Sequence, residues 1–115
     1  MAVKETHNVI CDHVPQLLNQ VGDIVTRINT RLQGMEIAPL HKLPSSLKII
    51  VMWNYRTGGL GIRVADRSEP VSVRLVPDVV AISLTRKELD GRDPAVVVKE
   101  KLRRALEGIC RVETF

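Results

Sequence analysis

We predict a single α+β domain of two layers, in which a helix, an antiparallel meander of three to four strands and a second helix follow one another. Apolar residues recur at helical spacing near both ends of the 115-residue chain, and residues 47–85 alternate as strands do. No repeat, low-complexity tract or linker divides the sequence. Residues 1–115 are therefore treated as one domain, with an N-terminal arm over 1–12 and a C-terminal tail over 110–115.

The first helix is predicted over residues 14–32, because apolar residues there recur at the i, i+3, i+4 and i+7 positions of one helix face. They are Val14, Leu17, Leu18, Val21, Ile24, Val25, Ile28 and Leu32. Asp12 is placed to cap this helix, and Gly34 is placed just past its end. Residues 35–46 contain two prolines and a pair of serines, which predicts a connecting loop.

The first strand is predicted over residues 48–55 and is apolar on both faces. Ile50 and Met52 alternate onto one face, and the other face carries Ile49, Val51, Trp53 and Tyr55. Other segments or another chain must pack against both faces of such a strand to bury its apolar side chains. The two glycines at 58 and 59 then predict a hairpin turn.

The next segments alternate between an apolar and a polar face. In residues 60–67 the apolar face holds Leu60, Ile62 and Val64, whereas Arg63 and Arg67 point away. Residues 71–76 continue this pattern, with Arg74 on the polar face. At residues 77 and 78 the apolar set moves from odd to even positions, which predicts a turn and a further strand over 79–85. One long bent strand is the alternative.

The second helix is predicted over residues 94–108, after a charged loop at 86–92. Asp93 is suited to the cap and Pro94 to the first turn. Its apolar face holds Ala95, Val98, Leu102, Ala105, Leu106 and Ile109. The element order resembles that of double-stranded RNA-binding domains, but the basic, glycine-containing start of their second helix is absent here, so no family is assigned.

Composition and charge limit the class of function without fixing it. Seventeen basic and thirteen acidic residues give a formal charge of +4, which permits contact with nucleic acid but does not require it. The sequence shows no secretory signal and no apolar stretch of membrane-spanning length, so we expect a soluble cytoplasmic protein that does not use a membrane. The two cysteines, Cys11 and Cys110, are expected to be reduced thiols, and a disulfide between them is the less favoured alternative.

Catalytic and metal-binding patterns are weak in this sequence. His7, Cys11 and His13 lie close together but match no spacing of metal ligands. The glycine-rich segment 57–61 joins two strands and has no phosphate-binding lysine, so it predicts a hairpin. We therefore expect no metal, no cofactor and no enzymatic activity. An enzyme of unknown class is the least favoured alternative.

Two surfaces remain as binding hypotheses. The first is the apolar face of Ile49, Val51, Trp53 and Tyr55, which would join copies of the chain into a homodimer or larger assembly, or bind an unknown protein partner. The alternative is nucleic-acid binding, in which arginine side chains contact phosphates. The arginines in question are Arg56, Arg63, Arg67 and Arg74.

Overall fold

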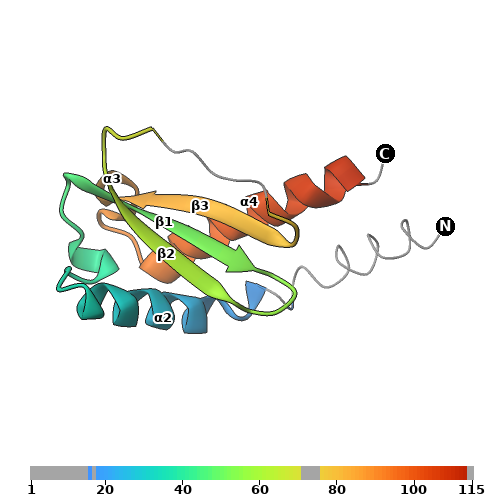
Figure 1. Ribbon diagram of the computed structural model, residues 1–115, viewed down its shortest axis with the longest axis horizontal. Helices are drawn as coiled ribbons and strands as arrows, with labels where there is room; N and C mark the ends of the chain where they lie inside the picture. The colour runs from blue at the N-terminus through green and yellow to red at the C-terminus, as the bar shows by residue number, and fades with distance from the viewer. Residues whose placement is uncertain (1–15, 17, 71–75, 114–115) are drawn as a thin grey trace.

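Helices and strands occur in the predicted α+β order, as the computed structural model in Figure 1 shows. The structure describes residues 16, 18–70 and 76–113, with side chains up to residue 109. The elements are α2 (Val21–Gly34), the short 3₁₀ helix η1 (Leu40–Lys42), β1 (Leu47–Asn54), β2 (Leu60–Asp66), β3 (Val79–Thr85), the single-turn helix α3 (Arg86–Leu89) and α4 (Pro94–Glu113).

The three strands form one antiparallel sheet in the order β2-β1-β3. The predicted α+β layout with an antiparallel sheet is confirmed, but the strands do not follow one another across the sheet, because β1 lies in its centre. Since β2 and β3 both run antiparallel to β1, they point the same way, and the chain between them must return to the other end of the sheet. The strand predicted over 71–76 falls mostly on residues 71–75, which lie outside the described residues.

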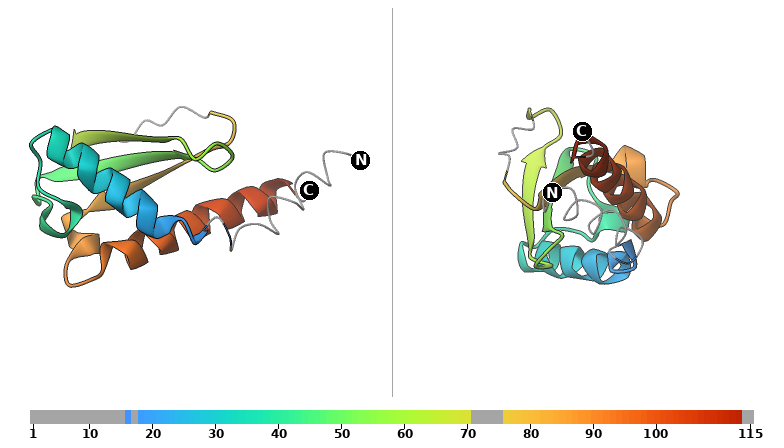
Figure 2. Two further views of the ribbon diagram at one scale, coloured as in Figure 1. Left: turned by 90° about the horizontal axis from the view of Figure 1, so that it is seen from below. Right: turned by 90° about the vertical axis from the view of Figure 1, so that its right-hand side faces the viewer.

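Both long helices pack on the same face of the sheet (Figure 2). α2 contacts β2 and α4, and α4 contacts β3, so the helices and the sheet form two layers. One cluster of buried apolar side chains fills the space between these layers. Its fully buried members include Ile24, Ile28, Leu32, Leu84, Val98, Leu102 and Leu106. None of the helices in the described part of the chain lies on the other face of the sheet.

The helix ends differ from those predicted. α2 begins at Val21, after a turn at residues 19 and 20 in which the Asn19 N–H donates to the Gln16 carbonyl (3.1 Å). Gln16 and Leu18, before this turn, are also helical, so the predicted helix is interrupted there. The cap predicted at Asp12 lies outside the described residues. α4 continues through Gly108 to Glu113, so residues 110–113 are helical where we expected a tail. Gly108 does not adopt a positive φ, the conformation with which glycine commonly ends a helix.

Two segments expected to be loops contain single helical turns. In η1, Leu40 is fully buried and its N–H donates to Asn29 Oδ1 (3.0 Å), which ties the loop to α2. In α3, Thr85 and Glu88 form a capping box, with the Thr85 N–H donating to Glu88 Oε1 (3.2 Å). This turn holds the end of β3 close to the start of α3.

Candidate interaction surface

The face predicted as an interface is the core of the domain. Ile49 and Val51 are 0% exposed, Trp53 is 1% exposed and Tyr55 is 8% exposed. All four belong to the cluster beneath the helices. The hypothesis that this face contacts a partner was therefore wrong, because these side chains already pack within one chain.

The pairing of β1 with its neighbours explains which face the helices cover. Trp53 lies opposite Leu60 of β2 and Val80 of β3, and Val51 lies opposite Ile62 and Ile82. Opposite residues in a sheet point to the same side. The odd positions of β1 thus share a face with the apolar even positions of both neighbours, and this combined face is the one that the helices cover.

The opposite face of the sheet, which we call the open face because no helix of the described residues lies on it, contains few charges around its centre. It is formed by Lys48, Ile50, Met52 and Asn54 of β1, Gly61, Arg63 and Ala65 of β2, and Val79, Ala81, Ser83 and Thr85 of β3. Ile50 and Ala65 are nevertheless buried on this face. At one end Lys48 is buried, and its amino group donates to the Glu69 carbonyl. At the centre Met52 is half-buried and lies between Gly61 and Ala81.

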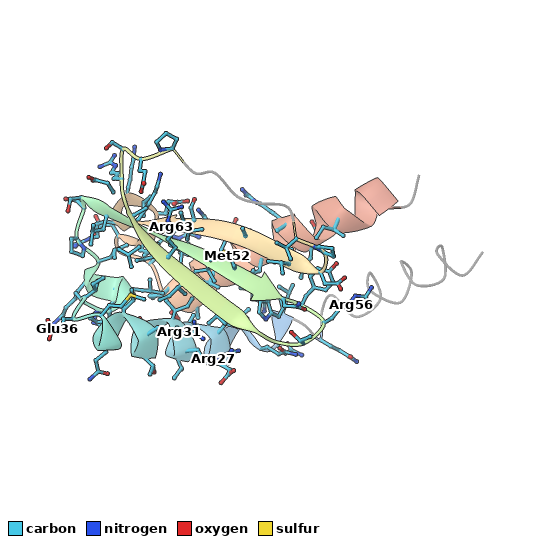
Figure 3. The ribbon with its side chains drawn as sticks, in the orientation of Figure 1. Arg27, Arg31, Glu36, Met52, Arg56 and Arg63 are labelled. Atoms are coloured by element: carbon cyan, nitrogen blue, oxygen red, sulfur yellow. The ribbon has the colours of Figure 1, made fainter. Side chains whose placement is uncertain are left out.

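The predicted nucleic-acid arginines do not form one cluster. Arg63 lies in the middle of β2, opposite Ile50, whereas Arg56 lies beyond the end of β1 at the hairpin (Figure 3). Each has a carboxylate partner, since Arg63 Nη2 lies 3.1 Å from Glu69 Oε1 and Arg56 Nε lies 2.7 Å from Asp78 Oδ1. Arg67 is exposed at the end of β2, and Arg74 lies outside the described residues. The ion pairs reduce the positive potential that this set would offer to phosphates.

The outer edge of β3 carries backbone groups that point away from the sheet. The Tyr55 N–H donates to the Asp78 carbonyl (3.1 Å), so the even residues of β3 bond to β1. The odd residues Val79, Ala81, Ser83 and Thr85 consequently direct their N–H and carbonyl groups outward. None of the seven residues of β3 is charged. Natural edge strands usually carry a charge, a proline or a bulge that prevents further pairing.

Only some of the outward backbone groups of β3 have hydrogen-bond partners among the described residues. The Ser83 carbonyl accepts from the Lys101 amino group, which also pairs with Glu88, and the Thr85 N–H donates to Glu88. The Val79 N–H donates to the Val76 carbonyl (3.2 Å). The remaining outward groups have no hydrogen-bond partner among the described residues. They are the Ala81 N–H, the Ala81 carbonyl, the Ser83 N–H and the Val79 carbonyl.

The Lys101 contact also changes the acidity of Glu88. Partial burial alone would raise the pKa of Glu88, but hydrogen bonds from Lys101 and Thr85 and the positive charge of Lys101 outweigh it. The net result is a pKa below the usual value of 4.5. Glu88 therefore remains ionised in mildly acidic solution and holds Lys101 over the end of the β3 edge.

Other features of the described part of the chain offer less. No three metal-ligating side chains gather within it, and none of its helices is long and apolar enough to span a membrane. A shallow hollow of about 470 Å³ beside α2 has no acidic or basic side chain in its lining, which consists of Thr26, Asn29, Thr30, Gln33, Ile37 and Pro39. The predicted cluster of His7, Cys11 and His13 lies outside the described residues.

Comparisons with protein-family models, with curated proteins and with solved structures found no match to this chain.

Proposed function

We propose that this protein is a small non-enzymatic interaction module that self-associates through its sheet, and that the contact is the outer edge of β3. The observation that carries the proposal is the uncharged β3 edge, on which the N–H and carbonyl of Ala81 have no partner among the described residues. Addition of a strand to such an edge is a common mode of protein association, because the backbone supplies the hydrogen bonds.

An unpaired edge gains more free energy from hydrogen bonds with a partner strand than from hydrogen bonds with water. Each backbone hydrogen bond contributes about 1 kcal/mol net. Apolar contact adds little to this, since Val80 and Ile82 on the core side of the same edge are only 4% and 8% exposed within one chain. An uncharged strand also sets no like charges against each other when it meets a second copy.

Sedimentation equilibrium tests the proposal directly. The chain has a mass of 12.9 kDa, and we expect the weight-average mass to rise toward twice that value between about 1 and 100 µM. Because backbone pairing of an uncharged strand has little ionic character, the association should change little with added salt. A mass that stays at 12.9 kDa over the whole range would contradict self-association.

A further inference from the structure

We infer that two copies of the chain pair their β3 strands antiparallel about a two-fold axis that passes beside Ala81, so that the two sheets become one. This inference rests on the proposed self-association and adds the register of the contact. A two-fold axis makes the same patch serve both copies, so the strand must be complementary to itself.

The hydrogen-bond pattern of the edge selects this register. With the axis at Ala81, the N–H and carbonyl of Ala81 in each copy meet those of Ala81 in the other. The Ser83 N–H then meets the Val79 carbonyl of the second copy. These are the outward groups that have no partner among the described residues of one chain.

The groups that are already occupied also face one another in this register. The Ser83 carbonyl, which accepts from Lys101, lies opposite the Val79 N–H, which donates to Val76. An axis at Ile82 would instead set the Ala81 N–H against the occupied Ser83 carbonyl. An axis at Ser83 would place the Ala81 N–H opposite Thr85, at the end of the strand. There the Thr85 N–H already donates to Glu88. In the register at Ala81 only the Val79 N–H and the Ser83 carbonyl must share or exchange their present partners as the strands pair, and each group without a partner meets another such group.

The side chains fit the same arrangement. On the open face Ala81 meets Ala81 and Val79 meets Ser83, which brings small uncharged side chains together. On the core face Val80 lies beside Ile82 of the second copy, and both side chains are already buried in the core of their own chain. No charged residue of β3 enters the contact, because β3 has none.

Cysteine cross-linking tests the register in a chain whose Cys11 and Cys110 are replaced by serine. Opposite residues of a hydrogen-bonded pair lie about 5.5 Å apart at Cα, which a disulfide can span. We expect Ala81→Cys to form a covalent dimer under mild oxidation. Gly61→Cys is the matched control, because Gly61 flanks Met52 on the β2 side as Ala81 does on the β3 side.

A mixing experiment tests which residues of the two β3 strands lie opposite each other. Val79→Cys alone and Ser83→Cys alone should each cross-link poorly, whereas a mixture of the two variants should cross-link well, since Val79 lies opposite Ser83 of the second copy. Efficient self-linking of Val79→Cys would overturn the register, and so would a dimer that is linked through Gly61→Cys but not through Ala81→Cys.

Failure of the register and failure of the proposed function give different results. A chain that sediments as a dimer but does not cross-link at Ala81→Cys retains self-association and loses the register. A chain that sediments as a monomer loses both. If the Ala81 amide of that monomer is protected from hydrogen exchange, the edge is satisfied within the chain itself.

Discussion

The two outer strands of the sheet are protected in different ways. β2 carries Arg63 and Asp66, and α2 runs along its side of the sheet, where Arg27 Nη1 donates to the Gly58 carbonyl (2.8 Å). β3 has no charge of its own, and among the described residues the charged side chains that protect its edge are Lys101 and Glu88, at one end. The difference shows that protection of a sheet edge depends on neighbouring helices as well as on the strand's own residues.

The largest difference between the two strands should appear when a core-facing side chain is shortened, as a difference in the loss of unfolding free energy. Leu84 of β3 is fully buried, so Leu84→Ala should lower the free energy of unfolding by about 2 to 5 kcal/mol. Val64 of β2 is only half-buried, and Val64→Ala should lower it by about 1 kcal/mol. Urea denaturation followed by circular dichroism measures both, at a concentration where the chain is monomeric. Equal losses of unfolding free energy would mean that the core side chains of the two strands contribute equally to stability.

Self-association should distinguish the two strands almost as strongly. Ala81→Lys places two ammonium groups opposite each other at the proposed axis, and the dissociation constant should rise by about 100-fold, or about 2.7 kcal/mol. Gly61→Lys adds the same charge to the same face beside β2 and should leave it unchanged. The space beside Gly61 accepts a side chain, since an added Cβ would lie 3.6 Å from Met52 Cε. Sedimentation measures both, and equal weakening would argue against the β3 edge.

The cations beside the two strands should contribute unequally to stability. Lys101→Met removes a hydrogen bond to Ser83 and an ion pair with Glu88 and should lower the free energy of unfolding by about 1.5 kcal/mol. Arg27→Met removes one hydrogen bond to Gly58 and should lower it by about 0.5 to 1 kcal/mol. Thermal unfolding of the paired variants gives the comparison. A larger loss from Arg27→Met would reverse the ranking of the two protections.

The pH dependence of stability should show the smallest effect. The pKa of Glu88 is lowered in the folded chain, so its ionised form stabilises the fold above pH 4.5. This contribution is lost as the pH falls from 4.5 through the lower pKa of the folded state. Glu88→Gln should remove that part of the acid sensitivity and leave the rest. Because Glu88 is more than a third exposed, we expect a difference of a few tenths of a kcal/mol. Urea midpoints of the two chains at pH 3 and pH 6 test it.

The sequence predicted whether each main element is a helix or a strand better than it predicted which elements lie side by side. Alternation in residues 60–66 and 79–85 and the helical spacing of the apolar residues reflect local burial, and both strands and both helices occur. The order β2-β1-β3 depends on contacts between distant segments, which these local patterns do not encode. β1 was the hardest case, because its two apolar faces gave no preference for either side.

One signal would have corrected the interface hypothesis. A hairpin pairs each odd position of residues 47–54 with an even position of residues 60–66, so Trp53 must share a face with the apolar Leu60, Ile62 and Val64. Had this parity been carried across the glycine turn, the Trp53 face would have been predicted as core. The β3 edge also has a sequence signal, since residues 79–85 contain no charge. That it is an edge is visible only in the fold.

Trp53 offers an optical means of separating folding from assembly. It is the only tryptophan of the chain, it lies on the central strand, and its buried Nε1 has no acceptor among the described residues. Its fluorescence should therefore lie at short wavelength in the folded chain and shift to the red only when the core opens. An association at the outer edge of β3 leaves this ring untouched. A single dilution series can thus record mass and emission together and assign each change to dissociation or to unfolding.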